Sequence, residues 1–229
     1  MATLLLLTTR FVRWLYLWAC ERLYAELAWS YDWVSWLVSL GAWSQWRATA
    51  LNYIHGTTIL EIGFGTGTLL TTMAQQGYTV VGLEYSPAMH RQAAAKLQRQ
   101  GLCVPRVQAP SQQMPFATGN FDTIISTFPS HYIVDPATLA ECKRLLCPPS
   151  PDSPSGRLVI VMGVTNVHTL WGVVLRFIFP QKATIAEHED PLLARFADAG
   201  LSARYVKVPQ GKAIVNLIIA EHYPEQPCT

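Results

Sequence analysis

Short apolar runs, each bounded by turn-forming residues, recur along the chain and predict β-strands. Residues 59–62 are apolar except for Glu61, and residues 78–83 are rich in β-branched side chains. Residues 120–128 and 157–162 are two further runs of this kind. The first run leads directly into a glycine-rich turn, after which the pattern changes to that of a helix.

The C-terminal part of the chain adds one helix and two strands. Residues 191–199 are amphipathic and are followed by Gly200, which is typical of a helix C-terminus. Residues 204–208 and 213–222 predict a final antiparallel pair of strands. Residues 147–156 are dominated by proline, serine and glycine, so we expect an exposed loop there.

Residues 1–56 differ in composition from the remainder, residues 57–229, which we expect to form the core. Seven of the eight tryptophans lie between Trp14 and Trp46, in a segment that predicts two or three helices forming a cap. Charged residues interrupt every window of about 20 residues that a transmembrane helix would need. Residues 11–46 are therefore expected to contact a membrane peripherally, to cover a ligand site, or to pack in the core.

Composition limits the possible functions. Half of the 229 residues are apolar, which suffices for one domain with a sizeable core. The net charge is +2 and no dense run of lysine and arginine occurs, so we do not expect a nucleic-acid partner. The five cysteines include no Cys-x-x-Cys pair, and no histidine cluster has the spacing of metal ligands. These features predict a cytoplasmic protein with reduced thiols and no metal site.

The turn after the first predicted strand is a candidate cofactor site. Gly63, Gly65 and Gly67 are spaced Gly-x-Gly-x-Gly, whereas a dinucleotide site has Gly-x-Gly-x-x-Gly. Glycines let a ligand approach the main chain, and the helix expected from near Thr68 offers free N–H groups at its start. The carboxylate of Glu61 would repel a pyrophosphate but would suit the ammonium and sulfonium of S-adenosylmethionine.

A second acid follows the second predicted strand. Glu84 lies 23 residues after Glu61, close to the interval at which such an acid accepts hydrogen bonds from a ribose diol. For Glu61 or Glu84 alone, a solvated strand end would be the simpler explanation. Two acids flanking a glycine-rich turn at this separation favour the cofactor interpretation.

These residues resemble the first two signatures of class I, Rossmann-like S-adenosylmethionine-dependent methyltransferases, in the methyltransferase type 11 group. Residues 85–89 are similar to the family's segment after the second acid, in which a methionine packs near the adenine. Residues 113–128 resemble its Leu-Pro-Phe…Phe-Asp stretch before the fourth strand. The resemblance implies a seven-stranded, mostly parallel sheet with helices on both faces, an N-terminal helical cap, and S-adenosylmethionine as cofactor.

One position departs from the family's pattern. The family has an aspartate that holds the adenine amino group where this chain has Pro110, which offers neither a carboxylate nor an N–H group. We therefore expect Ser111 and Gln112 to contact the base. The full set of expected cofactor-binding residues is Glu61, Gly63, Gly65, Gly67, Glu84, Tyr85, Met89, Ser111, Gln112 and Thr127.

The N-terminal cap resembles one branch of this family. Residues 31–47 are similar to a segment of the ubiquinone/menaquinone biosynthesis C-methyltransferases that pairs Tyr-Asp with a later Ser-x-Gly and a Trp-Arg, although Ser35 replaces a central asparagine. The resemblance implies a small hydrophobic acceptor, lipid-like or quinone-like. The candidate residues on the acceptor side are Tyr24, Tyr31 and Trp171, and the candidate catalytic residues are His131 and Tyr132, which follow the fourth predicted strand.

The expected chemistry depends mainly on the cofactor. Its sulfonium methyl is already activated, so the protein has to hold a nucleophile in line and exclude water. Two other classes of protein share some of these features. A nicotinamide oxidoreductase would need the dinucleotide spacing and a neutral residue in place of Glu61. A catalytically silent S-adenosylmethionine-binding module, or a membrane-associated assembly partner, is compatible with the sequence.

Overall fold

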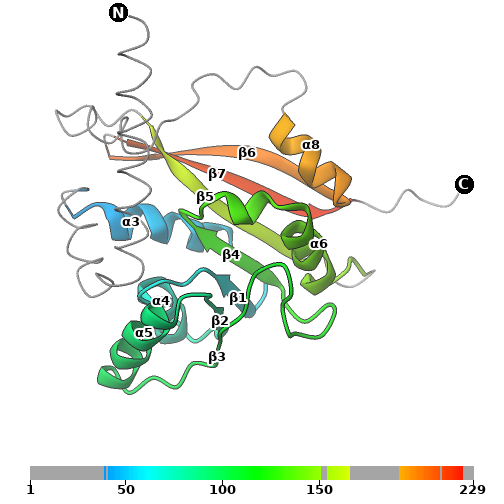
Figure 1. The fold of residues 1–229 in the computed structure, drawn as a ribbon. Coiled ribbons are helices and arrows are strands. Elements are labelled where there is room, and N and C mark those ends of the chain that lie inside the picture. The colour runs from blue at the N-terminus through cyan, green and yellow to red at the C-terminus, as the bar shows by residue number, and fades with distance from the viewer. Residues whose placement is uncertain (1–38, 40, 151–153, 166–190, 212, 224–229) are drawn as a thin grey trace, which may run out of the picture.

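The structure is a computed structural model that describes residues 39, 41–150, 154–165, 191–211 and 213–223. Its centre is a seven-stranded sheet with the order β3-β2-β1-β4-β5-β7-β6 (Figure 1). The strands are β1 (Thr58–Ile62), β2 (Thr79–Leu83), β3 (Arg106–Val107), β4 (Thr123–Thr127), β5 (Arg157–Thr165), β6 (Leu201–Gln210) and β7 (Ala213–His222). Strands β1 to β5 are parallel, and β7 is antiparallel to both β5 and β6. The order and directions confirm the predicted Rossmann-like sheet.

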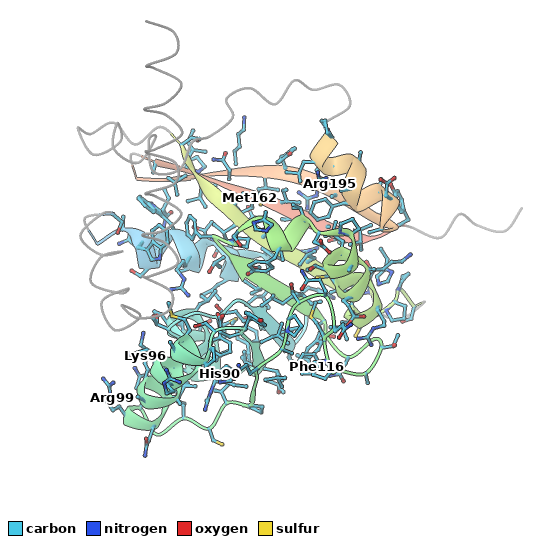
Figure 2. The ribbon with its side chains drawn as sticks, in the orientation of Figure 1. His90, Lys96, Arg99, Phe116, Met162 and Arg195 are labelled. Carbon is cyan, nitrogen blue, oxygen red and sulfur yellow. The ribbon has the colours of Figure 1, made fainter. Side chains whose placement is uncertain are left out.

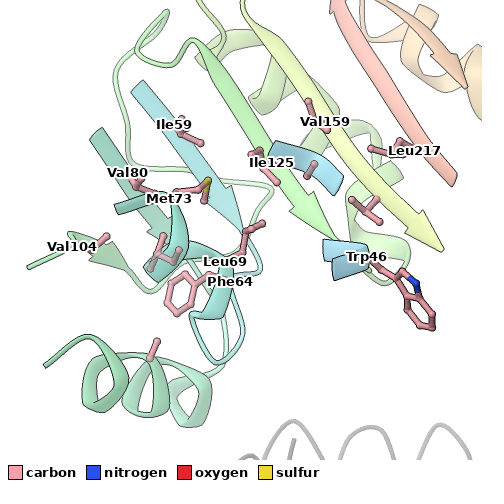
Figure 3. Close-up of a cluster of buried hydrophobic side chains, with 14 of the residues drawn as sticks. Trp46, Ile59, Phe64, Leu69, Met73, Val80, Val104, Ile125, Val159 and Leu217 are labelled. Atoms are coloured by element: carbon pink, nitrogen blue, oxygen red, sulfur yellow. The ribbon is translucent and has the colours of Figure 1, made fainter. Parts of the chain in front are cut away.

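Helices cover both faces of this sheet. They are α3 (Trp43–Ala48), the 3-10 helix η2 (Thr49–Tyr53), α4 (Thr68–Gln75), α5 (Pro87–Arg99), the 3-10 helix η3 (His131–Val134), α6 (Pro136–Leu145) and α8 (Pro191–Asp198). Because side chains alternate along a strand, Ile59 packs under α3, η2, α4 and α5, whereas Leu60 packs under η3, α6 and α8. Figure 3 shows the first of these two cores, including Trp46.

Local sequence signals start and stop several of these helices. The Ser86 hydroxyl caps α5 by accepting a hydrogen bond from the N–H of Met89, and Pro87 occupies the first turn. Asp135 caps α6 in the same way, ahead of Pro136. Gly200 follows α8 with a φ of 76°, so it ends that helix as expected.

The strand predictions are confirmed, although the two-residue strand β3 was not predicted. β7 has its predicted bounds, Ala213–His222, whereas β5 continues to Thr165 and β6 occupies Leu201–Gln210, so both are longer than predicted. At the base of the predicted loop, the N–H of Gly156 donates to the carbonyl of Cys147 at 2.7 Å. Pro148 in this loop is exposed.

Only the end of the predicted N-terminal cap is described. Helix α3 and η2 pack on the sheet through Trp46 and Ala50, both buried in the core. The remainder of the cap, including most of the segment expected to contact a membrane, lies outside the described residues. Within the described ranges, no helix has the length and apolar character needed to cross a bilayer. The same part of the chain contains no cluster of histidine, cysteine or acidic residues suited to a metal ion.

Candidate active site

A cavity of about 590 Å³ opens beyond the carboxyl ends of β1, β2 and β4. This is the point where the strand order reverses, because β2 and β4 lie on opposite sides of β1. Residues from three other places complete the walls: helix α3, the segment before α6, and the loop after β3. The predicted site residues that line the cavity are Gly63, Gly65, Glu84, Tyr85, Ser111, Gln112, Thr127 and Tyr132.

The glycine turn has the backbone that its sequence predicts. Gly63, Gly65 and Gly67 have φ values of 70°, 54° and 75°, in the left-handed region that favours glycine. Gly65 lines the cavity, and a Cβ added to it would meet no protein atom within 4 Å. The open space beside this main chain is what a ligand lying against it would require, so the turn fits a cofactor cradle.

Three of the predicted cofactor residues, Glu61, Gly67 and Met89, do not line the cavity. A Cβ on Gly67 would lie 2.8 Å from the Cβ of Ala93, so Gly67 allows α4 to pack closely against α5. Met89 is fully buried in α5. The structure gives Gly67 and Met89 a packing role: Gly67 caps α4 close to α5, and α5 turns the side chain of Met89 into the protein.

Glu84 is fixed in the cavity wall by main-chain hydrogen bonds. One carboxylate oxygen accepts from the N–H of Gly65 at 2.9 Å, and the other accepts from the N–H of Ser86 at 2.9 Å. A carboxylate oxygen can accept more than one hydrogen bond, so both oxygens keep capacity for the hydroxyls of a ribose. The acid therefore joins the glycine turn to the start of α5 and faces the cavity as predicted.

Glu61 occupies a different place from the one expected. It is fully buried, does not line the cavity, and lies 3.8 Å from the Nη2 atom of Arg47 in α3. Neither carboxylate oxygen has a hydrogen-bond partner among the described residues. Burial raises the pKa of Glu61 to about 8; the Arg47 charge lowers it and the nearby Glu84 raises it further.

Arg47 is a site residue that the sequence did not single out. Its guanidinium lines the cavity between Glu61 and the hydroxyl of Thr127, to which Nε donates at 3.3 Å. A buried guanidinium at the edge of a cavity is suited to an anionic group such as the carboxylate of an amino acid. At this place on the cavity wall, the structure therefore has the guanidinium of Arg47 and not the expected carboxylate of Glu61.

The segment expected to contact the base is built around Ser111. Its hydroxyl lies 3.0 Å from that of Thr138 in α6, which holds the segment against the helix. Gln112 and Pro110 line the cavity beside it, and Tyr85 presents a ring that is 72% exposed. Because the Ser111 hydroxyl is engaged with Thr138, Gln112 and the main chain offer the polar groups closest to a base.

The opposite wall is apolar and aromatic. Trp43 of α3 and Phe128, directly after β4, stack with ring centroids 4.2 Å apart and planes inclined by 22°. Both residues line the cavity, together with Pro129. Phe128 has a φ of 50°, a conformation that costs a non-glycine residue about 1–3 kcal/mol. Neither residue was expected at the site, although both lie in segments that carried the family resemblance.

The two candidate catalytic residues have different positions. Tyr132 lines the cavity with its hydroxyl against Gly63, 3.4 Å from the hydroxyl of Ser126. Burial raises the pKa of Tyr132 far above its usual value, so the phenol stays protonated and acts as a hydrogen-bonding group rather than a base. His131 is exposed and is not among the described residues that line the cavity, so its catalytic role stays a prediction that the geometry does not support. The reason is that η3 turns successive side chains in different directions.

The three acceptor-side candidates, Tyr24, Tyr31 and Trp171, lie outside the described residues. The residues that sequence reasoning missed are Trp43, Arg47 and Phe128. A signal for the first two existed, because the Trp-Arg pair of the family resemblance ends at Arg47 and Trp43 lies one helical turn before it.

Known proteins share this chain's sequence and fold. Residues 59–149 match a methyltransferase domain family. The chain is 27% identical over 222 residues to the demethylmenaquinone methyltransferase of Thermus thermophilus, covering 85% of this chain and 98% of that protein. It is 30% identical over 172 residues, or 69% of each protein, to the ubiquinone/menaquinone biosynthesis C-methyltransferase UbiE of Geotalea uraniireducens.

A solved structure gives the same architecture. A Methanococcus maripaludis protein, described as a candidate S-adenosyl-L-methionine-dependent methyltransferase, superposes with a TM-score of 0.63 over 88% of this chain and 94% of its own, at 18% identity. Strand order, glycine turn and cavity define a class I methyltransferase fold. The chain belongs to the S-adenosylmethionine-dependent methyltransferases, and S-adenosylmethionine is its cofactor.

The described residues fit this cofactor. When bound, S-adenosylmethionine supplies a methyl group activated by the neighbouring sulfonium. Gly65 leaves room for a ligand against the main chain, Glu84 offers oriented acceptors for ribose hydroxyls, and Arg47 offers a cation for the amino-acid carboxylate. The aromatic side chains of Trp43 and Phe128 make one wall of the same cavity apolar, which suits a reaction that water must not enter.

Proposed function

We propose that this methyltransferase acts on a small hydrophobic acceptor of the quinol type, and that it methylates a ring carbon. The observation that carries the proposal is the aromatic wall of the cavity, formed by Trp43, Phe128 and Pro129. Such a wall favours an apolar, flat acceptor over a polar one, because burying the acceptor against it removes apolar surface from water.

The names of the relatives support the same class of acceptor. The Thermus thermophilus relative is a demethylmenaquinone methyltransferase, and it is matched over nearly its whole length. The Geotalea uraniireducens relative acts in ubiquinone and menaquinone biosynthesis and is named a C-methyltransferase. A quinol ring is hydrophobic and carries hydroxyl groups that activate its carbons, which suits an apolar cavity containing a hydrogen-bonding phenol.

Tyr132 has a defined part in this proposal. It is protonated and lies at the first glycine of the turn, so it can hydrogen-bond to an acceptor oxygen without taking up a proton. In methyl transfer to carbon or oxygen, a proton must also leave the acceptor. We assign Tyr132 to orienting the acceptor and not to removing that proton.

The test is methyl transfer from S-adenosylmethionine carrying a labelled methyl group. The acceptors are a naphthoquinol with a short prenyl chain, a benzoquinol with the same chain, a simple phenol, and a nucleoside. Label in the prenylated quinols, located on a ring carbon by mass spectrometry, is the expected result. Label only in the nucleoside or the phenol would overturn the proposed acceptor. Tight cofactor binding with transfer to none of them would favour the catalytically silent module.

A further inference from the structure

We propose that Phe128, held against Trp43 in a left-handed backbone conformation, selects planar ring acceptors over flexible acyclic ones. The inference rests on the proposed function, since it concerns the acceptor side of the same cavity. It assigns the choice of acceptor to one stacked pair of residues from distant parts of the chain.

The first argument is the backbone of Phe128. Within the described residues, it is the one non-glycine residue with a positive φ, at 50°. Its N–H still donates to the carbonyl of Val161 at 2.8 Å, so the pairing of β4 with β5 extends up to this residue. The sheet therefore fixes the chain on one side of Phe128, and the unfavourable φ redirects the chain immediately after it. Such conformations persist where the surroundings impose them, and they cluster at functional sites.

The second argument is the support behind the ring. Trp43 stacks on Phe128 and also meets Trp46 edge to face, with centroids 6.2 Å apart and planes at 64°. Trp46 is 4% exposed and belongs to the core under α3. The N–H of Trp43 donates to the hydroxyl of Ser39 at 3.0 Å, at the start of the same helix. The three rings form one contiguous aromatic cluster. Because Trp46 anchors this cluster in the core, the ring of Phe128 is held in place on the cavity side.

The third argument is the position of the stack. Trp43 and Phe128 are each half-buried, and both line the cavity that also contains Gly65 and Glu84. A rigid aromatic surface attracts a second aromatic ring through offset or edge-to-face contacts in addition to the area buried. An acyclic chain gains the area but not the ring contact. The pair therefore favours a planar acceptor at the end of the cavity opposite the base-contacting segment.

The same stack has a simpler explanation, which is that it only fastens α3 to the sheet. The two accounts differ in what happens when the Phe128 ring is removed. If the stack only fastens α3 to the sheet, removing the ring should lower the melting temperature and weaken the binding of every acceptor equally. If the stack selects the acceptor, removing the ring should weaken the binding of planar acceptors only. Cofactor affinity should be retained, because Glu84 and the glycine turn are unaltered.

The experiment measures equilibrium binding by calorimetry in the presence of the demethylated cofactor, S-adenosylhomocysteine. The two probes are a naphthoquinone with a short prenyl chain and an acyclic 1,3-diketone with the same chain. Phe128→Leu should weaken binding of the naphthoquinone by about tenfold or more and that of the diketone by less than about twofold. Phe128→Gly should also lose the preference for the naphthoquinone over the diketone. Its melting temperature should be no lower than that of Phe128→Leu, since glycine accepts the positive φ.

The matched control is Phe116→Ala, at the residue labelled in Figure 2. Phe116 forms an edge-to-face pair with Phe121, and neither residue lines the cavity. The control variant should leave the ratio of the two affinities unchanged. Equal affinity of Phe128→Leu and the wild type for the naphthoquinone overturns the inference, as does an equal loss for both probes. Failure of the wild type to methylate the reduced quinol, with its naphthoquinone affinity still dependent on Phe128, would instead overturn the proposed function alone.

Discussion

Arg47 and Glu61 form a buried pair that joins helix α3 to the central strand β1, with Nη2 of the arginine 3.8 Å from Oε1 of the glutamate. The arginine reaches the cavity wall, and the glutamate lies fully buried behind it. Because burial outweighs the attraction of the guanidinium, the pKa of Glu61 is about 8. The charge behind the cofactor site therefore changes near neutral pH.

The stability of the cofactor-free protein should fall as the pH rises from about 4.5 to about 8. In this window the folded protein keeps the proton on Glu61, whereas the unfolded chain, in which the carboxyl has its ordinary pKa of 4.5, releases it. The contribution of Glu61 is thus complete below pH 4.5 and lost as the pH passes through about 8. The slope from this one group is at most about 1.4 kcal/mol per pH unit, and thermal melts across the window measure it.

Two variants separate Glu61 from other titrating groups. Glu61→Gln cannot ionise, so its melting temperature should depend less on pH between 5 and 8 than that of the wild type. Arg47→Met removes a charge that lowers the pKa of Glu61, so the loss of stability should extend to higher pH. An identical pH profile for Glu61→Gln and the wild type would contradict the account.

Glu84→Ala should weaken binding of S-adenosylmethionine by about 1.5–3 kcal/mol, the range for hydrogen bonds to a charged group. The carboxylate is already oriented by the N–H groups of Gly65 and Ser86, so its loss also frees the glycine turn. Calorimetry measures the affinity. Glu221→Ala removes an acid from β7 outside the cavity and should leave the affinity unchanged. Unaltered binding by Glu84→Ala, or tighter binding of NAD than of S-adenosylmethionine by the wild type, would refute the assignment.

Much of the fold could be predicted because its signals are local. The apolar runs, Gly200 and the glycine turn each act over a few neighbouring residues, and helix α8 and all strands except the two-residue β3 lie where these signals placed them. The seven-stranded, mostly parallel sheet came from the family resemblance, since local patterns do not determine which strands pair.

The site was only partly predictable for a related reason. Residues at consecutive strand ends, such as Gly65 and Glu84, reach the cavity because parallel strands end at one edge of the sheet. Arg47 and Phe128 come from distant segments of the chain. The contacts of Arg47 with Thr127 and of Phe128 with Trp43 depend on how α3 packs on the sheet. Glu61 was assigned to the cofactor because no local pattern indicates that Arg47 would lie beside it.

The glycines of the turn should respond differently to substitution. Gly65→Val forces a β-branched residue to a φ of 54°, at a cost of about 1–2 kcal/mol, and fills the space against which the cofactor lies. It should fold and lose cofactor binding. Gly67→Ala places a Cβ 2.8 Å from Ala93, so it should lower the melting temperature while the folded fraction still binds cofactor. Circular dichroism melts and calorimetry on both variants distinguish these effects, and wild-type cofactor affinity in Gly65→Val would contradict the cradle.

Substitutions of His131 and Tyr132, the neighbouring residues in the segment after β4, should have unequal effects on acceptor turnover. His131→Ala should keep acceptor turnover within about twofold of the wild type, because an exposed side chain outside the cavity contributes little to binding. Tyr132→Phe keeps the ring but removes the hydroxyl that pairs with Ser126, so it should raise the acceptor KM more than it changes cofactor affinity. Because the phenol stays protonated, the rate should show no ionisation of Tyr132 between pH 6 and 9. A large loss in His131→Ala would restore that residue as a catalytic candidate.

If the acceptor is hydrophobic, we expect the protein to contact a lipid surface. The tryptophans before α3 are the residues with which to test this expectation. If Trp14, Trp18 and Trp29 enter the interface, the protein should co-sediment with vesicles of neutral phospholipid, and its tryptophan emission should shift to the blue. The binding should depend little on salt, since the interfacial aromatic groups rather than basic residues supply it.

The matched variant replaces these three tryptophans with serine. It should remain in the supernatant yet bind S-adenosylmethionine normally, because Trp43 is the tryptophan that lines the described cavity. Its turnover of a soluble quinol with a short chain should also be retained, whereas turnover of a long-chain quinol in vesicles should fall. Equal sedimentation of the variant and the wild type, or no association of the wild type with vesicles, would assign the tryptophans to packing and favour a soluble acceptor.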